Sequence, residues 1–236
     1  MNDETREKLM GVSVATLATA LYKRGLRHQV IQGVGPVGHK GRNMVGPAFT
    51  LRYMPAREDR NQLVEFRNPE HPQRVAIETC PPGHVLVMDS RKSAAAASAG
   101  DILITRLMMR GAAGVVTDGG FRDAMNIAAL DMPAYHTRPA SPTNLTVNEA
   151  IALNEPIGCG DAPVFPNDVI VGDDDSVIVI PHEIADEIAT EAVEMTAYED
   201  FVMERVRAGE TIIGLYPQTK KEHAAAFAEW RAAQGR

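Results

Sequence analysis

The middle of the chain alternates between short apolar runs and helical segments, and this alternation restricts the fold more than any other feature. Residues 84–89 (HVLVMD) and 114–117 (GVVT) are compact apolar runs typical of buried strands. Apolar residues at helical spacing occupy 101–110 between them. A second helical segment over 122–130 and a strand near 134–136 continue the alternation. The pattern predicts an α/β architecture.

Both ends of the chain predict further elements. Residues 4–24 carry leucine and valine at roughly helical spacing and predict one N-terminal helix. Two β-rich runs, 168–171 and 177–180, flank a Gly-Asp-Asp-Asp-Ser turn and predict a hairpin. A long helix is expected from about 181 to 208. Residues 55–74 are charge-rich and lack apolar periodicity, so we interpret them as a solvated loop, with a lid over a site as the alternative.

Length and charge restrict the class of protein. With 236 residues, the chain can form a sizeable core, and we expect one domain over residues 1–215 followed by a C-terminal helical tail over 216–236.

The formal net charge of −7 argues against binding nucleic acid through bulk charge. No apolar run approaches the roughly 20 residues of a membrane helix, and the polar start lacks the apolar core of a signal peptide. Two cysteines make no disulfide framework. We expect a cytoplasmic protein that binds neither nucleic acid nor membrane.

Two short motifs are the strongest candidates for chemistry. Gly100-Asp101 precedes Arg122-Asp123 by twenty intervening residues. The intervening helix, strand and glycine turn can return the chain so that Asp101 faces the Arg-Asp pair. Helix N-termini offer unpaired N–H groups that can bind an anion. The planar guanidinium of an arginine can form two parallel hydrogen bonds with a carboxylate. Two aspartate carboxylates supply the oxygen ligands that Mg²⁺ prefers. The residues alone leave two interpretations open: a metal site with a carboxylate ligand, or acids that only cap helices while the arginine pairs with one of them.

The same stretch resembles the RraA-like family. The resemblance rests on Gly100-Asp101 and residues 110–123 (RGAAGVVTDGGFRD), and it extends to residues 46–50, 156–160 and 168–181. That family contains the class II 4-hydroxy-4-methyl-2-oxoglutarate/4-carboxy-4-hydroxy-2-oxoadipate aldolases and the regulator of ribonuclease activity A. An aspartate, twenty residues and an Arg-Asp pair distinguish the aldolases from the regulators, which lack the leading acid. The chain has that aspartate, so it resembles the aldolase branch.

The resemblance implies a fold and an activity. The fold would be an α/β/β sandwich of the swivelling-domain type with a C-terminal helical extension, assembled as a homotrimer or homohexamer. The activity would be that of a lyase that uses Mg²⁺ or Mn²⁺. It would cleave a 4-hydroxy-2-oxo acid to pyruvate and a carbonyl product through an enolate that the metal stabilises, with oxaloacetate decarboxylation as a side activity. Alternatives are a non-catalytic regulator of ribonuclease activity, and a decarboxylase or dehydratase acting on a sugar-derived 2-oxo acid.

The resemblance also implies residue roles. Asp123 would hold the metal, Asp101 would order water on the metal, and Arg122 would bind the carboxylate and the enolate oxygen. The backbone N–H groups that would clasp the substrate carboxylate are those of Gly100, Asp101, Ile102 and Leu103. Glu199 matches a glutamate that reaches the metal from an adjacent subunit.

Some departures from the family bear on the substrate. Thr19-Ala20-Leu21 stands where the family commonly has Asp-Ala-Leu. The residues His136-Thr137-Arg138-Pro139 replace a segment of small residues. Contact of His136 or Arg138 with the distal end of the substrate is one interpretation, and a structural role is the favoured one. Together with the long 55–74 segment, these departures suggest a substrate such as a 2-keto-3-deoxy sugar acid.

Other site motifs are weak. Asp173-Asp174-Asp175 lacks the alternation of an EF-hand and is interpreted as a solvated turn. The seven histidines and two cysteines show no zinc spacing. Gly33-x-Gly35-x-x-Gly38 matches a dinucleotide fingerprint literally, but no helical segment opens after Gly38.

Overall fold

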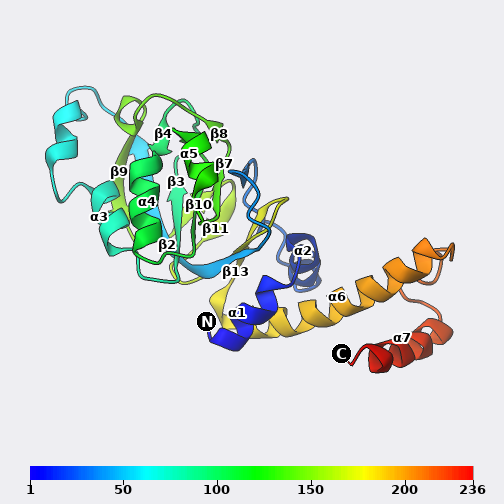
Figure 1. Cartoon of the computed structure of the whole chain (residues 1–236). Helices are drawn as coiled ribbons and strands as arrows, with labels where there is room; N and C mark the ends of the chain where they lie inside the picture. The colour runs from blue at the N-terminus through cyan, green and yellow to red at the C-terminus, as the bar shows by residue number, and fades with distance from the viewer. Residues whose placement is uncertain (236) are drawn as a thin grey trace.

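A computed structural model describes residues 1–235. Within these residues, a mixed sheet of eight strands forms the centre of the molecule (Figure 1). Its strand order is β1 (Gly35–Pro36), β7 (Ala134–His136), β5 (Gly114–Thr117), β3 (Val85–Asp89), β2 (Met44–Pro55), β12 (Val169–Gly172) and β13 (Val177–Ile180), with β9 (Asn148–Leu153) paired to β2. Strands β2, β3, β5 and β7 pair in parallel, and β12 and β13 form an antiparallel hairpin. The predicted α/β class is confirmed, and the chain forms the hairpin predicted around residues 168–180.

The main sheet is covered on both faces, which explains why its central strands are continuous apolar runs. On one face lie α3 (Pro72–Thr79), α4 (Asp101–Met109) and α5 (Ala124–Ala129) (Figure 1). Their side chains share a buried cluster with alternate residues of β3, Leu86 and Met88. The other alternate residues, Val85 and Val87, face a second cluster that includes the hairpin β10 (Ile157–Cys159) and β11 (Ala162–Val164). Successive side chains of a strand point to opposite faces, so the side chains of β3 alternate between two buried clusters.

Two predicted helices have different bounds in the structure. The single helix expected over 4–24 was wrong, because the chain forms α1 (Asp3–Met10) and α2 (Val14–Lys23). The side chain of Ser13 accepts a hydrogen bond from the N–H of Thr16 at 3.1 Å and so caps a new helix. The helix expected over 122–130 begins only at Ala124, because Asp123 has left-handed backbone angles (φ 58°, ψ 36°) that cannot continue an α-helix.

A second, small parallel sheet lies beyond the main one and positions the site. Strands β4 (Ala97–Ala99), β6 (Gly120–Phe121) and β8 (Arg138–Pro139) follow β3, β5 and β7 along the chain. They pair side by side in the same order as the strands that precede them. The chain therefore continues from one sheet into the other three times, and segments that leave the small sheet begin next to one another.

The buried carboxylate of Asp118 fixes the connections between the two sheets. It is 1% exposed and accepts hydrogen bonds from the N–H groups of Ser90 (2.6 Å), Lys92 (3.1 Å) and Gly160 (3.1 Å). Burial raises the pKa of Asp118, and these hydrogen bonds oppose the shift. One side chain thus holds the segment after β3 and the turn between β10 and β11 against the end of β5.

The 55–74 segment is not only a solvated loop. It contains the 3₁₀ helix η1 (Leu63–Arg67), and its last residues belong to α3, which starts with Pro72 in its first turn. Proline is well suited to that position because the N–H it lacks would have no partner inside the helix. The segment projects from the body beside α3 (Figure 1).

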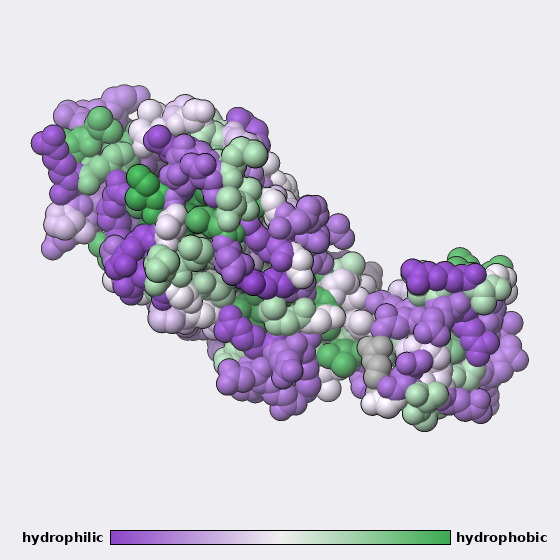
Figure 2. Space-filling view, viewed as in Figure 1, coloured by the Kyte–Doolittle hydropathy of each residue, from purple (hydrophilic) through white to green (hydrophobic). Residues whose placement is uncertain are grey.

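The C-terminal region forms a helical extension. After η3 (His182–Ile184), the helix α6 (Ala185–Arg207) first packs on α1 and α2 and then continues away from the sheet. Helix α7 (Lys221–Gln234) folds back along it, with Phe201, Leu215, Phe227 and Trp230 in a shared apolar cluster. Figure 2 shows this extension as a lobe beyond the main body. The cluster includes residues from both sides of position 216, and the domain boundary there stays a prediction.

None of the helices in residues 1–235 has both the length and the apolar character that crossing a bilayer requires.

The ring of His136 generates a pH prediction. It is 9% exposed, stacks on Phe121 and accepts the Phe121 N–H through Nδ1 at 3.3 Å. Burial lowers the pKa of His136, so the unfolded chain takes up a proton near pH 6.5 before the folded protein does. The free energy of unfolding should therefore fall as the pH is lowered from 7 to 5. His136→Asn keeps an acceptor but does not titrate, so it should flatten this fall in urea denaturation. The exposed-site variant His28→Asn is the control, and equal pH dependence in all three proteins would contradict the assignment.

Candidate functional site

The pairing of β4 with β6 brings the two candidate motifs together. Ala99 lies opposite Phe121 in the parallel pair, and the N–H of Arg122 donates to the carbonyl of Ala99 at 3.1 Å. Because parallel strands end at the same edge of a sheet, the residues that follow each strand are neighbours. Gly100-Asp101 therefore lies beside Arg122-Asp123, as the sequence predicted. The functions assigned to these residues stay predictions.

Gly100 allows this close approach because it has no side chain. A Cβ atom at this position would lie 2.8 Å from Cγ of Arg122 and 3.0 Å from Oδ2 of Asp123. The backbone of Gly100 is extended (φ −123°, ψ 179°), a conformation open to any residue. Glycine is therefore needed here because a side chain would collide with the Arg-Asp pair, and not because of its backbone angles.

Hydrogen bonds orient the carboxylates. Nε of Arg122 donates to Oδ2 of Asp123 at 3.2 Å, and the two side chains are 51% and 37% exposed. Asp101 accepts from the side-chain amide of Asn126 at 2.8 Å and from the N–H of Ile102 at 2.7 Å. The Ile102 N–H, which the resemblance assigned to the substrate carboxylate, is thus engaged by Asp101. Sequence reasoning missed Asn126, which lies in the first turn of α5 directly after the Arg-Asp pair.

Both motifs line a cavity of about 670 Å³. Its wall also contains the ends of the 63–74 segment, part of β4 and the start of the 3₁₀ helix η2 (Asn144–Thr146). The lining residues are Leu63, Phe66, Gln73, Arg74, Ala97, Ala99, Gly100, Asp101, Ile102, Leu103, Arg122, Asp123, Thr143 and Asn144. The cavity therefore joins the predicted site to a segment that we had interpreted as a solvated loop.

Three other candidates from the sequence lie outside this cavity lining. His136 is buried under Phe121, which agrees with the structural role favoured for it. Arg138 is exposed and donates to the carbonyl of Pro139 at 3.3 Å. Glu199 is on α6 and accepts from the hydroxyl of Thr16 at 2.8 Å in its own chain. The role of Glu199 in a neighbouring subunit stays a prediction.

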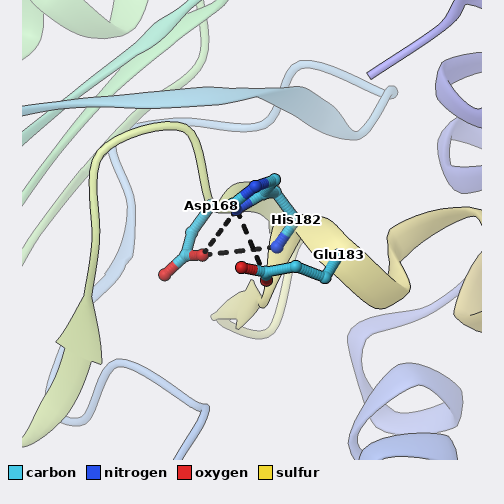
Figure 3. A group of neighbouring side chains, drawn as sticks. All are labelled: Asp168, His182 and Glu183. Carbon is cyan, nitrogen blue, oxygen red and sulfur yellow. Dashed lines mark hydrogen bonds and ion pairs between the residues drawn. The ribbon is translucent and has the colours of Figure 1, made fainter.

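A separate group of metal-ligating side chains lies where β13 leads into α6. One ligand atom each from Asp168, His182 and Glu183 lies within 4.8 Å of the others (Figure 3). Asp168 is 4% exposed, and its carboxylate already accepts the N–H groups of Phe165 (2.8 Å) and His182 (3.3 Å). Burial raises the pKa of Asp168 despite these bonds. The group is explained by its role in joining the start of β12 to the end of the hairpin.

Comparisons with known proteins agree with the resemblance. The family model described as RraA-like, Aldolase/RraA, matches residues 14–179. A relative from Halalkalibacterium halodurans, provisionally named a 4-hydroxy-4-methyl-2-oxoglutarate aldolase, is 36% identical over 109 residues, which are 45% of this chain and 50% of the relative. The chain spans half or less of the length of the curated relatives that it matches.

Solved structures of similar fold cover most of the chain. RraAS2 of Streptomyces coelicolor, described as an unusual member of the RNase ES inhibitor RraA protein family, is 30% identical and aligns with a TM-score of 0.75 over 85% of this chain and 96% of that one. An uncharacterized protein from Pseudomonas syringae pv. tomato is 21% identical. It aligns with a TM-score of 0.77 over 92% of this chain and 98% of its own. The second likeness concerns the fold alone.

The predicted α/β/β fold of the RraA type is therefore confirmed by both the family match and the structural neighbours. The family match covers more than half of the chain and includes both motifs of the site. The chain belongs to the RraA-like family.

Proposed function

We propose that this chain is a divalent-metal-dependent lyase that cleaves a 4-hydroxy-2-oxo acid to pyruvate and a carbonyl product. The observation that carries the proposal is the meeting of Gly100-Asp101 with Arg122-Asp123 in the wall of the 670 Å³ cavity. The relative named as an aldolase supports the same class of reaction. Oxaloacetate decarboxylation is proposed as a side activity, because it forms the same pyruvate enolate.

The donor set fits Mg²⁺ or Mn²⁺. Asp101 and Asp123 present carboxylate oxygens to one cavity, and hard oxygen ligands are those that these ions prefer. The missing side chain of Gly100 leaves the space beside Oδ2 of Asp123 open. Asp123 would hold the ion and Asp101 would act on it through water. When bound, the ion supplies Lewis acidity toward the 2-oxo group.

Arg122 would bind the substrate and stabilise developing charge. Its Nε donates to Asp123, which directs the planar guanidinium, and its terminal nitrogens make no hydrogen bond with another side chain in residues 1–235. Those nitrogens can donate to the substrate carboxylate and to the oxygen that becomes negative as the C3–C4 bond breaks. The first turn of α4 adds backbone N–H groups other than that of Ile102, which Asp101 already accepts. The C4 hydroxyl proton would pass to a carboxylate of the cavity through a water.

We extend the proposal to the assembly and the location of the protein. Family membership supports a homotrimer or homohexamer in the cytoplasm, in which Glu199 would approach the site of an adjacent subunit. The exposed apolar side chains of Met203, Val206 and Ile213 on the helical extension support association between chains.

A second function is favoured by one observation. The likeness to RraAS2, from the RNase ES inhibitor RraA protein family, supports a non-catalytic regulator of ribonuclease activity. Asp101 argues against this alternative, because the regulators lack the leading acid of the motif. A decarboxylase or dehydratase acting on a sugar-derived 2-oxo acid would use the same residues and is separated from an aldolase only by its products.

The test of the proposed function is a panel of 4-hydroxy-2-oxo acids and oxaloacetate, assayed for pyruvate release with added Mg²⁺ or Mn²⁺. We expect metal-dependent release from at least one acid, and loss of Mn²⁺ affinity in Asp123→Ala by calorimetry. Release from no acid, together with unchanged Mn²⁺ affinity in that variant, would reject the lyase.

Arg122→Lys should lower kcat/KM by at least about tenfold, because an ammonium group cannot reproduce two parallel hydrogen bonds to a carboxylate. The control is Arg138→Lys, which changes an exposed arginine outside the cavity lining. Activity of Arg122→Lys within twofold of the parent would show that Arg122 does not bind the carboxylate.

Gly100→Ala should lower kcat/KM by roughly ten- to a hundredfold, because the new Cβ displaces the side chains of Arg122 and Asp123. At Gly158 a Cβ would meet no atom within 4 Å, so Gly158→Ala is the matched control. Steady-state kinetics and thermal denaturation measured together separate a local displacement from unfolding. Full activity of a folded Gly100→Ala would contradict this account of the site.

A further inference from the structure

A second cavity lies between the 55–74 segment and β9. Its volume is about 260 Å³, and none of the described residues lines both this cavity and the one beside the Arg-Asp pair. Glu65, Asn68 and His71 line it from the segment, and Glu149 lines it from β9. The cavity is therefore distinct from the candidate active site.

The wall of this cavity carries negative charge without a positive partner. Glu65 lies in η1 and Glu149 in β9, and both residues are partly buried. Neither carboxylate forms a salt bridge or a hydrogen bond within residues 1–235, and no lysine or arginine of that range lines the cavity. A concave wall with charges of one sign concentrates ions of the opposite sign. The cavity therefore favours a cation.

A buried histidine in the same wall has no hydrogen-bond partner. His71 is 5% exposed, its Nδ1 is buried, and neither ring nitrogen forms a hydrogen bond within residues 1–235. An unpaired buried polar atom is costly to a folded protein. Burial lowers the pKa of His71 and Arg74 lowers it further, whereas Glu65 and Glu149 oppose the shift. The neutral ring that results has one nitrogen that can accept a hydrogen bond.

The two carboxylates and His71 do not form a compact metal site. In residues 1–235, ligand atoms of three such side chains lie within 4.8 Å of one another only at Asp168, His182 and Glu183. Side chains that hold one Zn²⁺ place their ligand atoms about 2 Å from the ion and so close to one another. The more widely spaced groups of this cavity suit a larger cation with several N–H donors.

An alkylammonium ion has these properties. A primary ammonium carries three N–H donors, enough for two carboxylates and one imidazole nitrogen. Hydrogen bonds between charged groups are roughly twice as strong as neutral ones. Pro72, Ala150 and Ile151 also line the cavity and give its wall an apolar surface for a carbon chain. The volume of about 260 Å³ limits that chain to a few carbons.

We propose that this cavity binds a short aliphatic amine as its ammonium ion, with Glu65 and Glu149 balancing the charge and His71 accepting an N–H. The site is independent of the proposed lyase reaction. Phe66, next to Glu65, lines the larger cavity and packs against His71 with ring centroids 5.6 Å apart. A bound amine would therefore join η1 to β9 and restrain one wall of the larger cavity.

The test is calorimetry of the full chain near pH 7 with 1,4-diaminobutane, and with 1,4-butanediol as the uncharged analogue of equal length. The diamine should bind saturably and at least about tenfold more tightly than the diol, because only the diamine forms charge-assisted hydrogen bonds. Equal binding of the two compounds, or no binding of the diamine, would overturn the proposal.

Glutamine variants locate the bound diamine. Glu65→Gln and Glu149→Gln should each weaken binding at least about fivefold, because the amide keeps the size of the side chain and removes its charge. Glu70→Gln is the matched control and should bind like the parent, since Glu70 is an exposed glutamate of the same segment outside the cavity lining. Binding that is lost in Asp123→Ala and retained in Glu149→Gln would place the amine in the larger cavity and reject this site.

His71→Leu separates recognition from folding. The ring makes no hydrogen bond within residues 1–235, so the melting temperature should stay close to that of the parent, while diamine affinity should fall several-fold because the acceptor is lost. A folded His71→Leu that binds the diamine as tightly as the parent would overturn the role of the histidine.

Hydrogen exchange and metal competition complete the test. The diamine should slow amide exchange in residues 61–71 of the parent and leave it unchanged in Glu149→Gln. Unchanged exchange in that segment of the parent would overturn the proposed position of the ligand. Displacement of the diamine by equimolar Zn²⁺ would show a metal site in place of an ammonium site.

Discussion

The parallel pairing of β4 with β6 is the contact on which the candidate site depends. These strands are only two and three residues long, yet the backbone bond from Arg122 to Ala99 sets the positions of both acidic motifs. The buried carboxylate of Asp118 stabilises the neighbouring turns, because it accepts hydrogen bonds from the N–H groups of Ser90, Lys92 and Gly160. Gly120 contributes by its lack of a side chain, since a Cβ there would lie 2.6 Å from Ala140. The geometry of the site is therefore a property of backbone packing between short strands.

The cavity has two ends of different construction. The end with Asp101 and Arg122 is built where β4 and β6 stop, so its groups are fixed by strand pairing and by the start of α4. The other end takes side chains from η1 and the start of α3, which lie in the connection between β2 and β3. Segments of this kind vary in shape more readily than paired strands do. In the proposed lyase, this division would separate the reacting groups from the groups that contact the rest of the substrate.

Sequence reasoning succeeded where a local pattern decided the structure. Strands β3 and β5 are mostly apolar and buried because both faces of the sheet are covered, and α4 has the expected periodicity. It failed at the break between α1 and α2, where the Ser13 cap prevails over a continuous apolar pattern. It also missed β4, β6 and β8, because strands of two or three residues have no measurable alternation. Asn126 was missed because its bond to Asp101 joins two separate helices.

The sequence by itself determined the candidate site residues: an aspartate, an arginine and a second aspartate at a spacing that one helix, one strand and one turn can close. It also determined the family, because that motif is specific. Only the tertiary structure decided that Arg74 and Asn144 join the same cavity, since they reach it from segments seventy positions apart that meet through contacts with other strands. Local periodicity carries no information about such contacts, because they depend on how separate elements pack. The candidate residues were therefore visible in the chain, and the cavity that they line became visible only in the fold.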